Sequence, residues 1–190
     1  MTLATEILNL DLVREAFPEG APRYAHIESA VRLAEEIEKA YGKFDGKLKL
    51  AVLYHDIGYA KQWDVTGFHP VDGAIAARAH GLGEDIAQAI LYHSGSWQEA
   101  RLMYPDLDSY YASECRMMET PLARAVTYCD LHTSPLGQNL SLDERVEDFN
   151  RTHATNQPLV DIIDAYYQRF QAITVEWQQV LETSYSKKVA

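Results

Sequence analysis

The sequence predicts an all-α fold, and three observations support this prediction. Apolar residues recur at the three- and four-residue spacing of amphipathic helices in one segment after another. No segment shows the strict alternation of a half-buried strand. Hydrophobic residues make up 47% of the 190 residues, enough for one full core and too many for a disordered chain. We therefore expect a compact, single-domain helical bundle.

The first two helical segments are the clearest. Residues 23–41, RYAHIESAVRLAEEIEKAY, carry apolar side chains on one face, and Gly42 follows as a stop signal. Residues 47–57 are apolar on nearly all sides and end at Gly58. This second pattern predicts a buried helix at the centre of the fold.

The middle of the chain predicts two shorter helices. His69-Pro70 places a proline at a natural first helical position, and the pattern runs to about Ala79. Residues 84–93, EDIAQAILYH, begin with two acids and continue with apolar residues at helical spacing. Residues 98–118 are rich in tyrosine and methionine and predict no defined element.

Three further helices complete the chain. Thr120-Pro121 has the form of an N-cap followed by proline, which predicts a helix to about Asp130. Residues 141–150 and 158–182 are amphipathic. We expect residues 1–190 to form one domain, in which 20–135 are the core and the helices of 136–190 pack on it.

Charge and composition exclude several classes of function. The net charge of −11 disfavours binding to a nucleic-acid polymer, which requires lysine and arginine to displace counterions. No apolar run approaches the ~20 residues of a membrane span. The N-terminal MTLATEILNLDL lacks the features of a signal peptide. Cys115 and Cys129 form no motif, and we interpret them as reduced core residues of a cytoplasmic protein.

Ionisable residues interrupt the predicted apolar faces at several points. His26 is in line with Ala30, Leu33 and Ile37, because four, seven and eleven residues at ~100° each return to about the same face. The pair His55-Asp56 ends the buried segment, and His93 and Asp130 share faces with apolar residues. A lone histidine is most often bonded to a backbone carbonyl, and Asp130 alone would fit a helix cap or a salt bridge. Several inward imidazoles and carboxylates together are satisfied more readily by a shared cation, such as iron, manganese, cobalt, nickel or zinc.

The order of these residues resembles a known family. His26 in RYAH, His55-Asp56 in YHDIG and Asp130 in ARAVTYCDLHTSP are similar to the H…HD…D signature of the HD-domain superfamily of metal-dependent phosphohydrolases. The resemblance covers roughly residues 20–135. It implies an all-helical core in which these four residues bind a first metal ion.

The resemblance also suggests a second metal ion. His69 in FHPVDGA and His93 in ILYHSG fall where two-metal members, including helical diadenosine tetraphosphatases and di-iron oxygenases, carry additional histidines. Asp56 would then bridge two ions and act as the catalytic carboxylate. Two departures are visible, since Tyr59 and Ala60 precede Lys61 where many members have lysine directly after HDIG, and Ser94 follows His93 where a second histidine is frequent.

The leading hypothesis is hydrolysis of a small nucleotide or another phosphorylated metabolite by a metal-activated water. Arg23 and Lys61 flank the predicted ligands and could bind a phosphate, although a solvated surface charge is the slightly favoured interpretation of each. The alternatives are a di-iron oxygenase with the same ligands, a metal-bearing binding module without turnover, and a purely structural helical protein. The sequence leaves the metal, the substrate and a homo-oligomeric state open.

Overall fold

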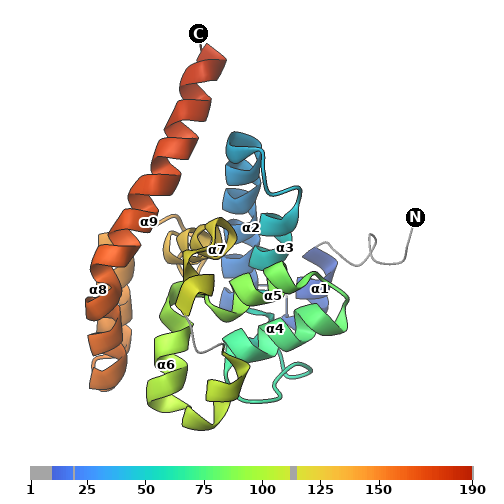
Figure 1. The fold of residues 1–190 in the computed structure, drawn as a ribbon, viewed down its shortest axis with the longest axis vertical. Helices are drawn as coiled ribbons and strands as arrows, with labels where there is room; N and C mark the ends of the chain where they lie inside the picture. Colours follow the sequence, from blue (N-terminus) through green and yellow to red (C-terminus); the bar gives the residue numbers. More distant parts are fainter. Residues whose placement is uncertain (1–9, 19, 112–114, 190) are drawn as a thin grey trace.

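The computed structural model describes residues 10–18, 20–111 and 115–189, and within them the regular structure is helical (Figure 1). The only β-type pairing there is an isolated antiparallel bridge between Thr133 and Asn139. The α-helices are α1 (Leu10–Ala16), α2 (Pro22–Tyr41), α3 (Lys47–Tyr54), α4 (His69–Ala79), α5 (Glu84–Leu91), α6 (Ser96–Met103), α7 (Pro121–Leu131), α8 (Leu142–Thr152) and α9 (Gln157–Val189). Short 3₁₀ segments follow at Ile57–Tyr59, His93–Gly95, Pro105–Tyr110 and Cys115–Glu119. The prediction of an all-α fold is confirmed.

Local sequence signals account for the ends of several helices. Pro22 occupies the first turn of α2, and Gly42 ends it with a left-handed φ of 68° while its N–H bonds to the carbonyl of Glu38. Thr120 caps α7, because its hydroxyl accepts from the N–H of Ala123 at 3.2 Å. These signals place α2 and α7, which carry the first and the last of the predicted ligands.

The central buried helix ends earlier than the sequence indicated. α3 stops at Tyr54, and a 3₁₀ turn over Ile57–Tyr59 replaces the expected continuation to residue 57. The reason is a close approach of two backbones, since a Cβ on Gly58 would lie 2.3 Å from the carbonyl oxygen of His69. The chain has to leave the helix to make this contact, and the turn carries Asp56 toward α4.

The helix predicted over 84–93 also ends early, at Leu91. His93 therefore lies in a 3₁₀ turn, in which Ser94 has a left-handed φ of 50°. The prediction that His93 faces inward with Ile86 and Ile90 is confirmed, because all three are buried. The position of His93 is set by the turn after α5 and not by the helix itself.

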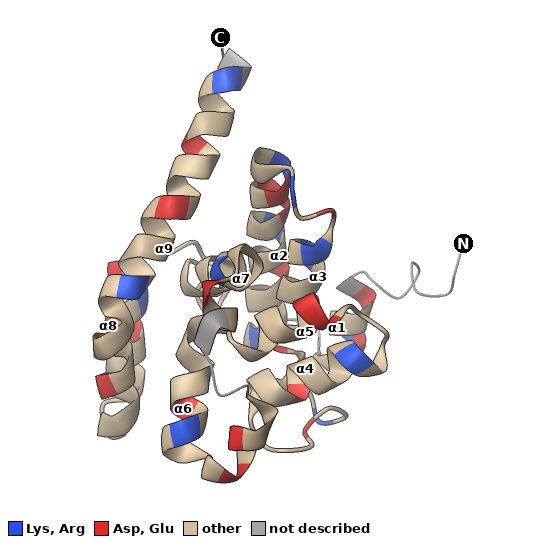
Figure 2. Ribbon diagram, in the orientation of Figure 1, with Lys and Arg blue, Asp and Glu red and all other residues tan. Residues whose placement is uncertain are grey.

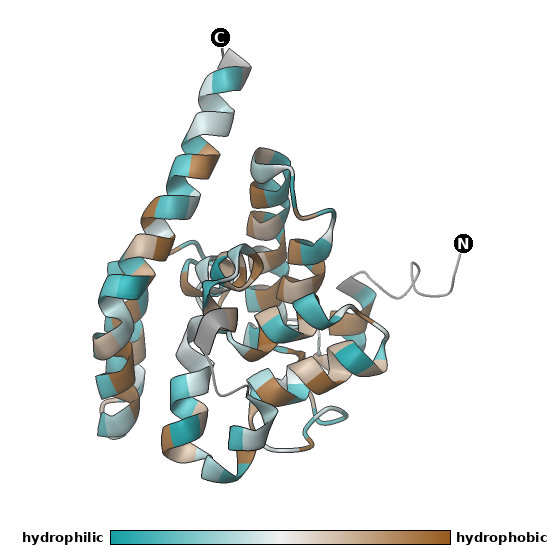
Figure 3. Cartoon of the chain, viewed as in Figure 1, coloured by the Kyte–Doolittle hydropathy of each residue, from teal (hydrophilic) through white to brown (hydrophobic). Residues whose placement is uncertain are grey.

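The last two helices lie side by side along one flank of the molecule (Figure 1). α9 packs against α2 and α7 through apolar residues, and Trp177 is fully buried with its ring 5.2 Å from that of Tyr41 and 5.6 Å from that of Phe44. Hydrophobic and hydrophilic residues alternate along α9 as expected of an amphipathic helix (Figure 3). α8 is held against α9, and this contact brings α8 to the edge of the core.

Acidic and basic residues are spread over the helices without gathering on one element (Figure 2). None of the helices in the described part of the chain is both long and apolar enough to span a bilayer. Cys129 is buried with a free thiol, and the side chain of Cys115 lies outside the part that the structure describes.

Candidate metal centre

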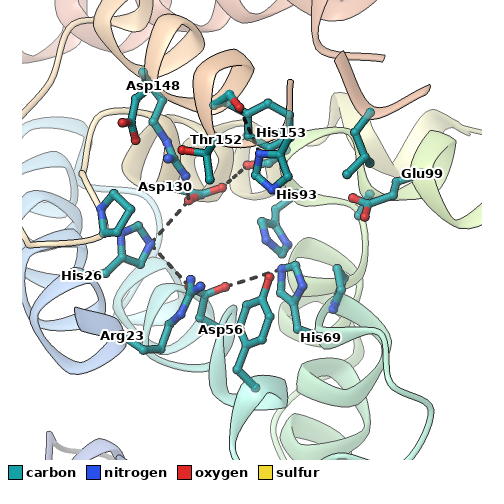
Figure 4. A pocket seen from close by; sticks show the side chains of 18 residues that line it. Arg23, His26, Asp56, His69, His93, Glu99, Asp130, Asp148, Thr152 and His153 are labelled. Carbon is teal, nitrogen blue, oxygen red and sulfur yellow. Dashed lines mark hydrogen bonds and ion pairs between the residues drawn. The ribbon is translucent and has the colours of Figure 1, made fainter. Parts of the chain in front are cut away.

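Six predicted ligands from five segments come together; all but His55 line one cavity (Figure 4), and His55 lies beside His26 with their Nε2 atoms 3.2 Å apart. Five of them are buried, and His69 is partly exposed. They come from α2, the end of α3, the start of α4, the turn after α5 and the end of α7: His26, His55, Asp56, His69, His93 and Asp130. Because α2 and α7 pack against each other, His26 and Asp130 become neighbours although 104 positions separate them.

The first group of ligand atoms forms a small triangle. The Nε2 atoms of His26 and His55 lie 3.2 Å apart, and each lies 3.5 Å from Oδ2 of Asp56. The carboxylate of Asp130 lies beside this triangle, with its Oδ1 3.4 Å from Nε2 of His26 and 4.0 Å from Nε2 of His55. All four predicted ligands of the first site therefore meet.

Backbone carbonyls orient the imidazole rings. Nδ1 of His26 lies 3.1 Å from the carbonyl oxygen of Ser134, and Nδ1 of His55 lies 2.6 Å from that of Val52. A carbonyl oxygen only accepts, so the proton of each neutral ring resides on Nδ1 and Nε2 presents a lone pair. Two lone pairs and a carboxylate then face one point, which is the arrangement that a cation satisfies.

A second group shares Asp56 with the first. Oδ1 of Asp56 lies 3.5 Å from Nε2 of His69, and His93 offers a ligand atom within 4.8 Å of both. Nδ1 of His93 donates to the carbonyl of Ile90 at 2.5 Å, so its Nε2 is also free to bind a metal. The two oxygens of Asp56 thus face two different groups of histidines.

The donor set and its dimensions fit divalent transition metals. Imidazole and carboxylate ligands at ~2.0–2.2 Å from a metal ion lie about 3 to 3.5 Å from one another. The three edges of the first group, 3.2, 3.5 and 3.5 Å, agree with this range. Two nitrogen-rich groups that share one carboxylate suit iron, manganese, cobalt, nickel or zinc.

A comparison with protein-family models identifies this architecture. The model described as the HD domain matches residues 23–133, which is more than half of the chain. The chain belongs to the HD-domain family. The resemblance noted in the sequence is confirmed, and membership places the chain in a superfamily of metal-dependent phosphohydrolases. Searches of curated proteins and of solved structures found no match.

Burial sets the protonation of two histidines in the HD domain. It lowers the pKa of His55 to about 4 and that of His69 to about 3. Both rings are therefore neutral near neutral pH, which is the state that binds metal. Burial also lowers the pKa of His26, but its hydrogen bond with Asp130 and the charge of Asp56 outweigh burial and raise it.

The two aspartates of the HD domain remain ionised. Burial would raise the pKa of Asp56, but its electrostatic interactions with His55, Arg23 and His26 hold it below its ordinary value, and the Arg23 guanidinium among them is charged at neutral pH. Burial acts in the same direction on Asp130, and there His26 and Arg145 hold the pKa well below the usual range. The pocket therefore offers two carboxylates at neutral pH.

The two predicted substrate-binding residues differ in position. Arg23 lines the cavity, donates to Oδ2 of Asp56 and lies over the ring of Tyr59 at 4.1 Å. Tyr59 in turn stacks on His69 with ring centroids 4.2 Å apart. Lys61 is exposed and is not among the residues that line the cavity, so the structure does not bring it to the HD site.

Ser94, where a second histidine is frequent in the family, has a defined place. Its hydroxyl donates to Oδ2 of Asp130, and its backbone N–H bonds to Oγ1 of Thr127 at 3.0 Å. Ser94 therefore orients a metal ligand of the HD domain from the outside. The sequence alone marked this position only as a departure from the family.

The cavity above the ligands has a volume of about 360 Å³, in the range of small-molecule sites. Two of its walls were not predicted. α6 contributes Ser96 and Glu99, and α8 contributes Arg145, Asp148 and Thr152 (Figure 4). These residues carry no spacing signal, because charged side chains on an amphipathic helix look alike in sequence whether they face water or a cavity.

Glu99 is the unusual member of the α6 wall. It is partly buried, and within the described residues no hydrogen bond or ion pair to its carboxylate is found. Burial raises its pKa to about 7. A carboxyl group that holds a proton near neutral pH is thereby present in the same cavity as the metal ligands.

Proposed function

We propose that this HD-domain protein is a metal-dependent phosphohydrolase that acts on a small nucleotide or another phosphorylated metabolite. The observation that carries the proposal is the shared Asp56, whose two oxygens face His26 and His55 on one side and His69 on the other. A carboxylate whose two oxygens face two groups of histidines could contribute a ligand to each of two ions, as in two-metal hydrolytic sites.

The metal ions would be held by His26, His55, Asp56 and Asp130 in one site and by Asp56, His69 and His93 in the other. When bound, they supply Lewis acidity toward a phosphoryl oxygen and lower the pKa of a coordinated water. Arg23 contributes positive charge beside Asp56, and Ser94 keeps the Asp130 carboxylate in place. The cavity is large enough for a phosphoryl group and a small leaving group.

Glu99 is placed to serve as the general acid. Water supplies the oxygen that forms the new bond to phosphorus, and the bond between phosphorus and the leaving oxygen breaks. Glu99 gives its proton to that oxygen, and the proton released by the water restores the acid in the next turnover.

An oxygenase is the second candidate, because the second group of ligands is rich in histidine. Two irons in this ligand set can bind oxygen and an organic substrate. Oxygen consumption by iron-loaded protein in the presence of candidate substrates distinguishes the two activities.

The test is phosphate release from a panel of nucleotides and sugar phosphates, with manganese, cobalt or iron(II). Asp56→Ala protein serves as the inactive control, and Asp64→Asn, an exposed carboxylate outside the cavity, as the matched surface control. Turnover in wild-type and Asp64→Asn protein that is lost in Asp56→Ala supports the proposal. A phosphatase activity that survives Asp56→Ala does not belong to this site.

A further inference from the structure

The wall of the cavity that faces the metal ligands comes from outside the family match. The HD-domain match ends at residue 133, whereas α8 spans Leu142–Thr152. Figure 4 shows Asp148 and Thr152 on the side of the cavity opposite Asp56 and His69, and Arg145 of the same helix also lines the cavity. The chain therefore completes its site with a helix that the family pattern does not describe.

Arg145 is the cation of this wall. Its side chain is 17% exposed, and its Nη2 lies 3.7 Å from Oδ1 of Asp130, beyond hydrogen-bond length. Its Nε is buried and has no hydrogen-bond partner within the described residues. A guanidinium has five N–H donors, and leaving a buried one unpaired is unfavourable. Arg145 lines the cavity, so a ligand there could accept from the outer N–H groups of the guanidinium.

A second arginine with almost the same exposure behaves differently. Arg124 is 18% exposed, and its Nε donates to Oε2 of Glu176 at 2.7 Å while its Nη1 donates to Glu119 at 3.2 Å. Arg23, on the other side of the cavity, is committed to Asp56 and to the face of Tyr59. Arg145 thus differs from both, because within the described residues no hydrogen bond of its guanidinium is found.

Asp130 does not satisfy the hydrogen-bond donors of the Arg145 guanidinium. Its Oδ1 already faces His26 at 3.4 Å, and its Oδ2 accepts from Ser94. The neighbouring carboxylate on the same wall, Asp148, is paired with Arg151 on the exposed side of α8. Neither acid makes a hydrogen bond to the guanidinium.

The position of Arg145 is well defined before any ligand binds. Ser141 and Glu144 form a capping box at the start of α8, with N–H to side-chain distances of 3.3 and 2.8 Å. Leu142 is buried beneath the first turn, and α8 packs along α9. Arg145 therefore lies on a helix whose start is anchored, which reduces the entropy lost on binding.

We propose that Arg145 binds the non-bridging oxygens of the substrate's phosphoryl group beside the metal centre, as a forked donor supplied by α8. This inference rests on the proposed function and assigns the residue that selects a phosphorylated substrate in this chain. A planar guanidinium can donate to two phosphate oxygens at once, whereas a lysine ammonium acts as a single point charge. The net charge of −11 makes a local cation more necessary, because the surface repels anions.

The test is calorimetric titration of metal-loaded full-length protein with inorganic phosphate. Four proteins are compared: wild type, Arg145→Gln, Arg145→Lys and Arg124→Gln. Metal content is measured on each by mass spectrometry. We expect Arg145→Gln to weaken phosphate binding by ~10- to 100-fold with unchanged metal content, since hydrogen bonds to charged groups are among the stronger ones. Arg145→Lys should be intermediate, and Arg124→Gln should bind as wild type.

Each other outcome overturns the inference. Wild-type binding in Arg145→Gln means that Arg145 does not contact the anion, and loss of metal in that variant means that Arg145 positions Asp130. If Arg145→Gln does not fold, Arg145→Lys provides the test. Wild-type phosphate affinity of Arg145→Lys also refutes the forked contact. Failure of the proposed function looks different: phosphate binding would depend on Arg145 while no phosphorylated compound is hydrolysed.

Discussion

Nε2 of His26 and Nε2 of His55 lie 3.2 Å apart, although Nδ1 of each ring is already bonded to a backbone carbonyl. When both rings are neutral, their Nε2 lone pairs face the same point, and in the absence of a metal ion Asp130 and Asp56 favour a proton on His26 instead. The carbonyls of Ser134 and Val52 orient both rings in a way that suits metal binding. This pair is the observation that points most directly to a cation at this cluster.

The first prediction concerns metal stoichiometry. We expect wild-type protein to bind two ions per chain and His69→Ala to bind about one. His69 faces Oδ1 of Asp56 and belongs only to the second group of ligands. Asp56→Asn should lose most of both bound ions, since its amide offers one acceptor oxygen where the carboxylate offers two. Metal content after dialysis measures this, and the exposed Asp64→Asn is the control. Two ions retained in His69→Ala would contradict the second site.

Metal removal should also lower stability. A ligand at 100 times its Kd stabilises the folded state by about 2.7 kcal/mol, which corresponds to about 5 to 10 °C in Tm for a chain of this size. Chelation should therefore lower the Tm of wild-type protein by that amount. The Tm of Asp56→Asn should respond little to chelation, and an equal response in both proteins would place the stabilising metal elsewhere.

The second prediction concerns Gly58. A Cβ at this position would lie 2.3 Å from the carbonyl oxygen of His69 and 2.8 Å from the backbone nitrogen of Gly73. Gly58→Ala should force α4 away from the 3₁₀ turn and destabilise the protein by about 2 to 4 kcal/mol. It should also displace His69, so that the second metal ion is lost before the first.

Denaturant unfolding and metal content measure the effect of Gly58→Ala. Gly83→Ala is the matched control, because its new Cβ would meet only the side chain of Asp85, which is half exposed and can move. Equal stability of the two variants would refute the close approach of Gly58 to α4.

The third prediction concerns Ser94. Its hydroxyl is bonded to Asp130, and outer partners of this kind typically contribute 10- to 100-fold to metal affinity. Ser94→Ala should weaken the first metal site by about that factor with little change in Tm of the metal-free protein. Competition with a fluorescent chelator measures the affinity. Ser109→Ala, at an exposed position, should leave it unchanged.

The fourth prediction concerns the pH dependence due to Glu99. A general acid works while protonated, so kcat/KM should fall as pH rises through the Glu99 pKa of about 7. Glu99→Gln should lower kcat and remove this alkaline limb. Tyr59 and Tyr111 lie close enough to interact with Glu99, but burial raises the pKa of both phenols well above their ordinary value, so they do not titrate in this range. An unchanged pH profile in Glu99→Gln would exclude the role.

The same group predicts a stability change with a definite sign. The pKa of Glu99 is raised from its ordinary value of 4.5, so the folded protein binds this proton more tightly than the unfolded chain. Its stabilising contribution is complete below about pH 4.5 and is lost as pH rises through about 7. Glu99→Gln should therefore raise the Tm at pH 8 by several degrees relative to wild type, and the difference should vanish at pH 4.

The helical class could be predicted from the sequence because it depends on local periodicity, and the order of the ionisable residues indicated the candidate metal ligands that the structure brings together. The apolar stripe of residues 23–41 places His26 on an inward face whatever the helix packs against. The order of His26, His55-Asp56 and Asp130 is itself the family signature. Lys61 shows the limit of such reasoning, because nearness to Asp56 in sequence did not bring it to the cavity.

Tertiary structure decided how the site is completed. Arg145 and Arg151 stand on the same helix in similar sequence surroundings, yet Arg145 is 17% exposed in the cavity wall and Arg151 is 76% exposed. Glu99 and Ser94 likewise acquire their roles only where α6 and α7 meet the turn after α5. Sequence periodicity determines which face of a helix is apolar, whereas a charged residue becomes part of a site only when a distant element removes it from water.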